Sequence, residues 1–473
     1  MRIPLQEVVF DPLPTADPRE RVFRWNHRLF RAVPLRKAGF YRDLFARGLM
    51  PRLVERGLLI RTDLTDLELE GYGLVLEHQD ASFRSLPMEW CAAMFKDAAL
   101  KLIELQLDLA QAGLALRQAH PWQMVFDGIR CYFCDLGAIE PAAEGLSPAA
   151  WEDLLHHWIL PLQVMAAGHS RVAHWLLHDY ARGVLQPEYE ALTRKPCLGE
   201  VLTAWHQQAV SRCKSWVPTP VRALVRRARR ARQGARLSPA SRTSVPFSLL
   251  ERQREAIATL AIPEARTEWS EYSDALFPAF GDPGTWNTKH RSWDEIIRDV
   301  QPRTILDMGS NRGWFAQLAA RRGASALAAD LDEPALGKCY LDAKQSQLPL
   351  LPVLLDFRNP TPGFGVANEW FAPATERLQV ELAAGLALVH HFVFKQGLTF
   401  EAIIRGLSAF TKRHLVVEFI GPEDRFVRDW WSANYDWYTF ENFLRILRQE
   451  YQAIKEYPSN MDHRVLLLCT REA

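Results

Sequence analysis

Residues 306–315 read Leu-Asp-Met-Gly-Ser-Asn-Arg-Gly-Trp-Phe, and this stretch decides the fold of the C-terminal half. The apolar residues 304–308 predict a short buried strand and residues 314–322 predict a helix, so both glycines lie in a strand-to-helix turn. Glycine lets the backbone approach a ligand closely, and a helix N-terminus offers unpaired N–H groups. The stretch therefore predicts a ligand-binding turn at the end of a strand.

Strands and helices alternate outward from this turn. Strands are predicted at 304–308, 326–329, 350–355, 382–389, 414–419 and 464–469, and helices at 293–300, 314–322, 334–343 and 439–450. Pro352 weakens the case for the third strand, because proline cannot donate a ladder hydrogen bond. The alternation predicts an α/β fold with a doubly wound, mostly parallel, Rossmann-like sheet, whose ligand lies beyond the carboxyl ends of the strands.

Three acids follow three successive predicted strands. They are Asp307, Asp330 and Asp356, and Asp330 lies where a carboxylate can accept both hydroxyls of a ribose. Because parallel strands end at one edge of a sheet, the acids should converge with the glycine turn on a cofactor site. A nicotinamide dehydrogenase would need G-x-G-x-x-G, and no glycine follows Gly309 and Gly313 at the required offset. The pattern therefore disfavours a nicotinamide cofactor.

With these residues, the segment from Trp269 to Ala473 resembles class I S-adenosylmethionine-dependent methyltransferases. The family's first motif, acid-x-Gly-x-Gly-x-Gly, has Asn311 in place of its middle glycine here, and asparagine tolerates the left-handed conformation well. The resemblance implies S-adenosyl-L-methionine as the cofactor, bound by the backbone of the turn, by a ribose acid, by an adenine acid and by the loop after the fourth strand. The implied cofactor-binding residues are Asp307, Gly309, Asn311, Gly313, Asp330 (ribose), Asp356 (adenine amino group) and Leu388. Asp332 is expected to cap the next helix instead.

Candidate catalytic residues follow the fourth and fifth strands. Methyl transfer is an in-line displacement that needs a base only when the acceptor is a hydroxyl or a weak amine nucleophile. His390 or His391 could deprotonate such an acceptor, and we favour His390; a histidine hydrogen-bonded in the turn is the alternative. Glu418 could act as a base, orient the acceptor, or be a plain strand-end carboxylate. The aromatic residues of 430–438 could stack on a flat substrate or belong to the core.

A second resemblance covers more of the chain. Residues 267–272, 354–360, 387–391 and 417–419 together resemble a group of bacterial two-part methyltransferase-like proteins that includes host-specific nodulation proteins of rhizobia. By this resemblance Tyr272 and Lys289 would cover the cofactor, and the N-terminal part would have a kinase-derived fold.

The N-terminal half is accordingly expected to be an α+β, helix-rich, degenerate kinase-like domain. A helix is predicted at 94–115, followed by a hairpin with an Asp127-Gly128 turn. By the resemblance Gln118 stands at the catalytic acid, Gln123 at a metal-binding asparagine, and Asp135 keeps the position of the metal-binding acid. Glutamine cannot act as a base, and the two-metal clamp is incomplete, so we expect this half to be inactive as a kinase.

Composition sets the remaining expectations. The 473 residues carry 57 basic and 56 acidic side chains, so no nucleic-acid partner is indicated. Seven cysteines at irregular spacing favour a reduced, cytoplasmic location, and Cys131 and Cys134 are expected to be buried thiols, with no metal site. No apolar run is long enough to span a membrane. We place domains at 1–235 and 265–473 and a linker at 236–264.

The arginine-rich segment Arg222–Arg236 reads as a solvated basic helix or as a peripheral contact with an anionic surface. The expected function is methyl transfer to a small-molecule or glycan acceptor, through an oxygen of that acceptor, with the glycan choice resting on the resemblance alone. Two alternatives stay open: a phosphotransferase regulated by the C-terminal domain, and a non-catalytic binding protein with a relic cofactor pocket. The sequence leaves the oligomeric state open.

Overall fold

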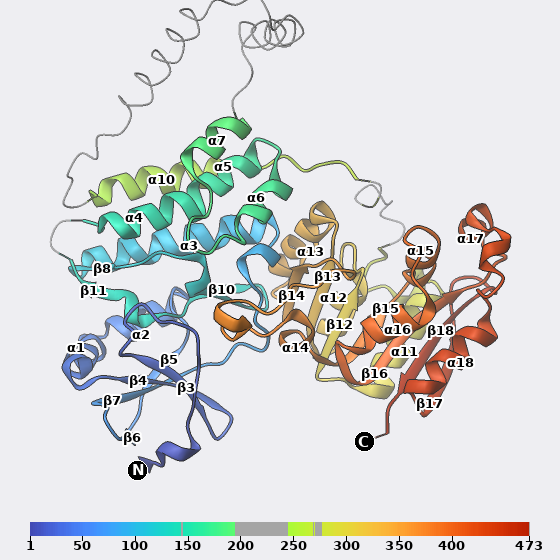
Figure 1. Cartoon of the computed structure of the whole chain (residues 1–473), viewed down its shortest axis with the longest axis horizontal. Helices are drawn as coiled ribbons and strands as arrows, with labels where there is room; N and C mark the ends of the chain where they lie inside the picture. Colours follow the sequence, from blue (N-terminus) through green and yellow to red (C-terminus); the bar gives the residue numbers. More distant parts are fainter. Residues whose placement is uncertain (143–144, 194–244, 268, 270–276, 473) are drawn as a thin grey trace, which may run out of the picture.

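The computed structural model describes residues 1–142, 145–193, 245–267, 269 and 277–472. The N-terminal and C-terminal halves lie side by side, on the left and the right of Figure 1. Within the described ranges, no helix is both long and apolar enough to cross a bilayer.

The N-terminal half begins with a small lobe built on a five-stranded antiparallel sheet of order β2-β3-β4-β7-β5. Phe23 and Phe30 stack 5.4 Å apart on the buried face of this sheet, where alternating apolar residues put them. The lobe's elements are β1 (Arg2–Ile3), β2 (Val9–Phe10), β3 (Arg21–Trp25), β4 (Arg28–Val33), α1 (Leu35–Ala46), α2 (Leu49–Glu55), β5 (Thr62–Leu64), β6 (Glu68–Leu69) and β7 (Leu74–His78).

A helical lobe follows, centred on the buried helix α3 (Ala92–Gln111). Its other elements are β8 (Leu114–Leu116), β9 (Met124–Asp127), β10 (Arg130–Phe133), β11 (Ile139–Pro141), α4 (Pro148–Leu154), α5 (Leu160–Ala166), α6 (Ser170–Leu176), α7 (Gln186–Thr193) and α10 (Phe247–Thr259). The predicted helix at 94–115 is too long at its end, because Gly113 takes a φ of +71° and residues 114–116 pair as β8. The hairpin is confirmed, with Gly128 at a φ of +60°. The N-terminal half therefore has the two-lobed arrangement that the kinase resemblance predicts for it.

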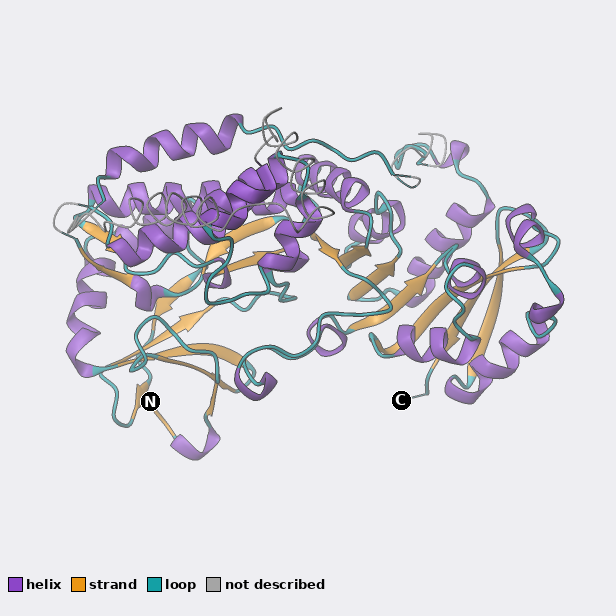
Figure 2. Cartoon of the chain, turned by 45° about the horizontal axis from the view of Figure 1, so that its top comes forward, coloured by secondary structure: helices purple, strands orange, loops and turns teal. Residues whose placement is uncertain are grey.

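The C-terminal half is built on a seven-stranded sheet of order β14-β13-β12-β15-β16-β18-β17, in which β18 runs antiparallel to both neighbours. The strands are β12 (Thr304–Met308), β13 (Ser325–Asp330), β14 (Leu350–Leu354), β15 (Val380–Gly385), β16 (Thr411–Ile420), β17 (Ala453–Pro458) and β18 (Arg464–Thr470). The strand order reverses at β12, so right-handed crossovers place the helices that connect β12 to β13 and β13 to β14 on one face and those that connect β15 to β16 on the other. Helices cover both faces of the sheet in Figure 2. These helices are α11 (Thr288–Val300), α12 (Trp314–Arg321), α13 (Glu333–Gln345), α14 (Ala374–Arg377), α15 (Val389–Phe394), α16 (Phe400–Ser408), α17 (Arg425–Trp430) and α18 (Phe440–Glu450).

The doubly wound, Rossmann-like sheet is confirmed, and one predicted strand needs correction. The predicted strand at 382–389 ends at Gly385, and Val389 already begins a helix, because Ala387 takes a left-handed φ of +52° between them. The edge strand β17 and the helix α16 were missed. Pro352 does lie in a strand, and it is tolerated because β14 is at the edge of the sheet.

Helix α10 lies inside the range 236–264 that the sequence assigns to a linker. Its Leu250 and Ile257 are buried, and it packs along α3. Lys96 of α3 holds the end of this helix by donating to the carbonyl oxygens of Ala258 (2.9 Å) and Leu260 (2.8 Å). The exact domain boundaries stay a prediction.

Candidate functional site

The glycine turn after β12 is a tight cradle of left-handed residues. Gly309, Asn311 and Gly313 have φ values of +72°, +50° and +69°. A Cβ atom on Gly309 would lie 2.8 Å from Cδ1 of Leu388, and one on Gly313 would lie 2.4 Å from Sγ of Cys339. Both positions therefore need glycine, and Asn311 adopts the conformation that its replacement of a glycine requires.

Asp330, at the end of β13, is bonded to the backbone of the same turn. Its Oδ2 accepts from the N–H of Asn311 (2.6 Å) and its Oδ1 from the N–H of Asp332 (2.8 Å). The Asn311 side chain in turn donates to the carbonyl oxygen of Trp269 (2.9 Å). Asp332 caps α13 by accepting from the N–H of Ala335, which confirms its predicted role. The ends of β12 and β13 are thus held as one unit.

Asp307 carries an unsatisfied buried oxygen at this edge. The residue is 1% exposed, and within the described residues its Oδ2 and the hydroxyl of Ser310 have no hydrogen-bond partner. Burial raises the pKa of Asp307 to about 7, although the nearby Lys289 ammonium opposes the rise. An unpaired buried carboxylate oxygen is costly, so this edge is built to receive a donor or a cation.

Asp356, two residues beyond β14, lies at the same end of the sheet. Its carboxylate forms a two-pronged ion pair with Arg358, with distances of 3.0 Å to Nε and 2.8 Å to Nη2. These bonds to Arg358 lower the pKa of Asp356, so it is ionised at neutral pH. The side chain is 27% exposed and remains open to a ligand.

Glu418, on β16, is fully buried and fully bonded. Its Oε2 accepts from Nζ of Lys289 (2.6 Å) and from the N–H of Ala387 (2.7 Å), and its Oε1 accepts from the hydroxyl of Ser459 (2.6 Å). Burial alone would raise the pKa of Glu418, but Lys289 and Ser459 outweigh it and the pKa lies below its ordinary value. Because Ala387 directly precedes Leu388, this carboxylate fixes the loop that faces the glycine turn. A catalytic role for Glu418 stays a prediction.

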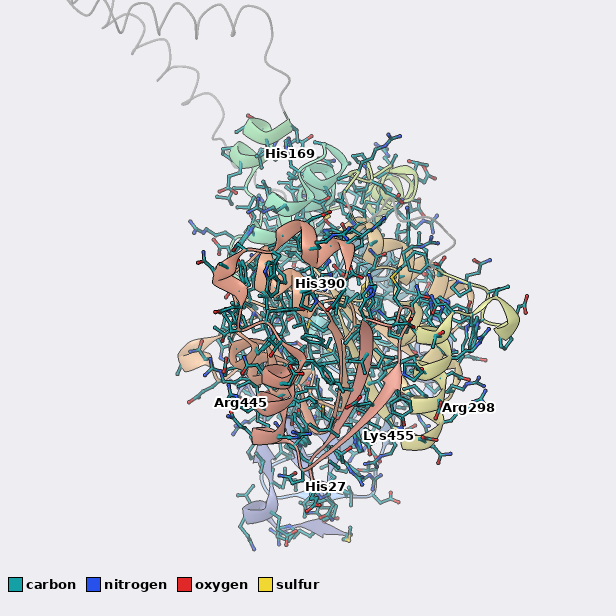
Figure 3. The ribbon with its side chains drawn as sticks, turned by 90° about the vertical axis from the view of Figure 1, so that its right-hand side faces the viewer. His27, His169, Arg298, His390, Arg445 and Lys455 are labelled. Carbon is teal, nitrogen blue, oxygen red and sulfur yellow. The ribbon has the colours of Figure 1, made fainter. Side chains whose placement is uncertain are left out.

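His390 lies in α15, directly after that loop, and is labelled in Figure 3. It is 3% exposed, and its Nδ1 has no hydrogen-bond partner among the described residues. Burial, reinforced by the neighbouring His391, lowers the pKa of His390 to about 2, so the ring is neutral at physiological pH. The two imidazole rings lie 4.1 Å apart, and His391 is the less buried of the pair.

The aromatic residues of 430–438 divide into two groups. Tyr438 belongs to the core, where it is fully buried and donates to the carbonyl oxygen of Ile420. Trp430 instead faces the histidines, 5.3 Å from the ring of His391. The ammonium of Lys395 lies over both Trp430 (4.9 Å) and Trp269 (5.1 Å). An aromatic wall of Trp430 and Trp269 therefore stands beside the histidine pair.

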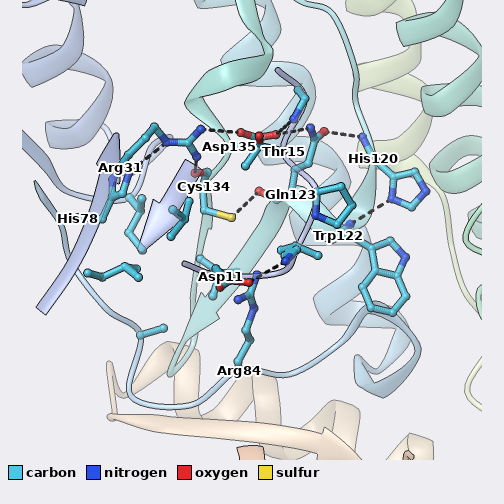
Figure 4. A pocket seen from close by; sticks show the side chains of 18 of the residues that line it. Asp11, Thr15, Arg31, His78, Arg84, His120, Trp122, Gln123, Cys134 and Asp135 are labelled. Carbon is cyan, nitrogen blue, oxygen red and sulfur yellow. Dashed lines mark hydrogen bonds and ion pairs between the residues drawn. The ribbon is translucent and has the colours of Figure 1, made fainter. Parts of the chain in front are cut away.

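The N-terminal half contains a cleft of about 530 Å³ between its lobes, shown in Figure 4. At one end, Asp135 accepts from four protein donors: Arg31, Gly137, Ala16 and Gln123, at 2.8 to 3.2 Å. The N–H of Ala16 comes from the loop between β2 and β3, which folds down onto the carboxylate. The acid that the kinase resemblance assigns to metal binding is therefore already satisfied by the protein.

The other N-terminal candidates have ordinary structural roles. The side-chain amide of Gln123 donates to Asp135. Gln118 lines the cleft, and its amide side chain cannot act as a base. Among the described residues there is no cluster of three or more possible metal ligands. Cys131 is a buried free thiol as predicted, whereas the free thiol Cys134 is only partly buried. Arg31, which the sequence analysis did not single out, pairs with Glu20 and Asp135 while 2% exposed. The available signal was a charged residue inside an apolar strand.

The structure thus gathers the predicted cofactor residues and the two predicted catalytic residues at the carboxyl edge of one sheet. It adds three groups that sequence reasoning passed over: the Ser310 hydroxyl, the Trp269 carbonyl and the Ser459 hydroxyl. Lys289 lies at the site, paired with Glu418. Tyr272 and the segment Arg222–Arg236 lie outside the described residues.

The strand order with its single antiparallel strand, and the glycine turn after the central strand, are the doubly wound arrangement that the resemblance to class I methyltransferases predicts for the C-terminal half. No family model matches the chain. The chain is 24% identical over 457 residues to the nodulation protein NoeA of Rhizobium meliloti (strain 1021). The aligned region covers 93% of this chain and 92% of that protein. Because the similarity spans both halves, it confirms the resemblance to two-part proteins related to nodulation proteins.

Two solved structures are similar over shorter stretches. The bifunctional kinase-methyltransferase WbdD is 19% identical, covering 42% of this chain and 44% of that chain with a TM-score of 0.31. Magnesium protoporphyrin IX methyltransferase (ChlM) from Synechocystis PCC 6803, with bound S-adenosylmethionine, is 13% identical, covering 38% of this chain and 79% of that chain with a TM-score of 0.28. This chain therefore spans less than half the length of WbdD.

Proposed function

We propose that the chain transfers a methyl group from S-adenosylmethionine to an acceptor oxygen of a glycan or small metabolite. The observation that carries this proposal is the cradle itself: a glycine turn packed against Leu388, with the unpaired Asp307 oxygen at its base. An anionic oxygen at a buried edge suits the ammonium group of the cofactor, and the turn is too tight for any side chain at Gly309. The residues present therefore fit this cofactor.

The cofactor would supply an electrophilic methyl group on a sulfonium. The backbone of residues 309–313 would hold its methionine part together with Leu388, Asp330 would accept from its ribose hydroxyls, and Asp356 would accept from its adenine amino group. Glu418 would keep the Leu388 loop in place through the N–H of Ala387. Backbone N–H groups hold the carboxylates of Asp330 and Glu418 in place, which favours a preorganised site.

The acceptor would be deprotonated by the histidine pair, with Trp430 and Trp269 forming the wall beside it. His390 is neutral, and its Nδ1 has no hydrogen-bond partner among the described residues, so the ring can receive a proton; its low pKa makes it a weak base until a ligand changes its surroundings. His391 is more exposed and is the second candidate. Alanine variants of each, compared with the wild type by kcat for one acceptor, decide between them. If both variants kept the wild-type rate, neither histidine would be the base.

Calorimetric titration with S-adenosylmethionine tests the cofactor assignment. We expect binding by the wild type, and a loss of at least tenfold in affinity for Asp330→Asn, because a ribose-binding carboxylate would be replaced by an isosteric amide. Asp299→Asn, at an exposed position near the end of α11, is the matched control and should bind normally. A folded wild-type protein that binds no S-adenosylmethionine would overturn the proposal.

Incubating cell extract with methyl-labelled cofactor, followed by mass spectrometry, would then identify the acceptor. Labelled product from the wild type and none from Asp330→Asn would establish an enzyme. Cofactor binding without any labelled product would favour a binding protein with a relic pocket. A phosphotransferase is disfavoured by the four protein donors on Asp135, which leave its oxygens no vacancy for a metal ion.

A further inference from the structure

One segment of the N-terminal half, residues Phe83–Ala92, touches both the cleft and the methyltransferase half; we call it the connector. It joins the last strand of the small lobe, β7, to helix α3 of the helical lobe. Phe83 and Arg84 line the 530 Å³ cleft, and Pro87–Glu89 form a short buried helical turn. A movement of one lobe relative to the other would therefore displace the connector.

The first contact of the connector is a buried ion pair across the two halves. Glu89 (1% exposed side chain) accepts from Arg377 (5% exposed side chain) at 2.6 Å and 3.1 Å in a two-pronged pair. Arg377 also donates to the carbonyl oxygen of Arg84 and, at 2.7 Å, to that of Ala372, so its guanidinium is bonded on every side. Pairs of this geometry in a water-excluded place hold both backbones rigidly.

Arg377 belongs to the segment 359–377 between β14 and β15, which runs out from Asp356 and returns into β15. The same segment lays Phe364 on Trp122 of the cleft, with ring centroids 4.5 Å apart and nearly parallel. The far end of β15 leads to Leu388. The ion pair thus anchors the stretch of chain that connects the predicted adenine-side acid to the loop facing the glycine turn.

The second contact of the connector is at Glu333. Its Oε1 accepts from the N–H of Ala92, at the end of the connector, and from Nε2 of His174, both at 2.9 Å. Glu333 begins α13 and follows Asp332, which caps that helix and bonds to Asp330 through its N–H. The connector therefore also holds the ribose-side loop.

We propose that Glu89, Arg377 and Glu333 are positioning residues of the cofactor site, so that the N-terminal half sets cofactor affinity through the connector. This inference rests on the proposed function, because it takes Asp330 and Asp356 as cofactor ligands. The ends of the two strands that carry these acids are joined by one backbone hydrogen bond, from the N–H of Leu355 to the carbonyl oxygen of Asp330 (2.9 Å). The chain beyond each acid is in addition bonded to the connector, through Arg377 on one side and Glu333 on the other. A shift of the connector would therefore move both acids together.

The experiment measures cofactor affinity by calorimetry and steady-state kinetics in the full chain for Arg377→Met, Glu89→Gln and Glu333→Gln. We expect S-adenosylmethionine to bind about 3- to 30-fold more weakly, in its Kd and in its KM, because positioning residues away from a ligand change its binding by this order. The KM of the acceptor and kcat should change much less. Arg377→Lys, which keeps one charged donor, should recover part of the affinity.

Lys344→Met is the matched control, since it removes another ion pair between the halves, to Asp97, at the end of α13 remote from the cofactor loops. Normal cofactor affinity in this variant, beside weakened affinity in the other three, supports the inference. Equal weakening in Lys344→Met would overturn it, because any loosening of the interface would then suffice. Unchanged affinity in Glu333→Gln and Glu89→Gln would also overturn it.

The failure of this inference is distinguishable from the failure of the proposed function. A wild type that binds no S-adenosylmethionine overturns both, whereas a wild type that binds while the three variants bind equally well overturns only the positioning role. If Arg377→Met fails to fold, as a buried glutamate without its partner can cause, Glu333→Gln decides, because Glu333 is partly exposed and the change keeps its volume.

Discussion

Replacing Lys289 by methionine removes the only cation bonded directly to Glu418 among the described residues, and the structure predicts both the size and the pH dependence of the effect. The carboxylate is 0% exposed and the pair is 2.6 Å long. Removing one partner of a buried pair costs about 3–5 kcal/mol, because the remaining charge stays desolvated. Glu418 keeps its bonds to Ser459 and to the N–H of Ala387, so we expect the lower part of that range.

The pH dependence of the same variant has a definite sign. In the wild type the pKa of Glu418 lies below its ordinary value, so its contribution to stability is full above that ordinary value and is lost as pH falls through the folded pKa. Without Lys289, burial dominates and the folded pKa rises above the ordinary value. The variant's stability then falls as pH rises, by about 1.4 kcal/mol for each unit by which the folded pKa exceeds the unfolded one.

Urea denaturation at pH 5 and pH 8 measures this directly. We expect Lys289→Met to lose more unfolding free energy, relative to wild type, at pH 8 than at pH 5. Lys455→Met, which removes an exposed pair with Asp299, should leave the transition nearly unchanged at both pH values. A destabilisation of Lys289→Met that is independent of pH, or larger at pH 5, would refute the reasoning that Glu418 depends on Lys289 for its charge.

Three further predictions concern the cradle and the acid below it. Gly309→Ala should weaken S-adenosylmethionine at least tenfold in calorimetry, because its Cβ would lie 2.8 Å from Leu388 at a φ of +72°; normal binding would show that the turn does not approach the ligand. Gly313→Ala should lower the free energy of unfolding by about 2–4 kcal/mol, and with it the melting temperature, since its Cβ would lie 2.4 Å from the buried sulfur of Cys339 at a positive φ. An unchanged melting temperature would contradict the packing described. The pKa of Asp307 near 7 predicts that cofactor affinity rises from pH 6 to pH 8, as the carboxylate that we propose to pair with the cofactor's ammonium ionises, and that Asp307→Asn removes this rise; a pH dependence that persists in the variant would assign it to another group.

Local patterns were enough to predict the C-terminal sheet and the edge of it at which the candidate site lies. Strand ends, the glycine turn and the left-handed Asn311 depend on residues within a few positions of one another, so periodicity and turn chemistry reveal them. The strand predicted at 382–389 was too long at its end, because the apolar run continues past Gly385 although the backbone turns at Ala387. It also missed β17, whose outward-facing polar residues hide the strand.

What the sequence by itself determined is therefore the class of fold, the edge of the sheet that carries the site and the acids that stand there. Only the tertiary structure decided the state of those groups: that Glu418 is bonded to Lys289, 129 residues away, and that Asp135 is closed off by Ala16, 119 residues away. The tertiary structure alone showed that Arg377 forms an ion pair with Glu89, 288 residues away in the sequence. The physical reason is that the protonation and freedom of a buried group depend on burial and on partners that folding brings from distant parts of the chain, and no local periodicity records them.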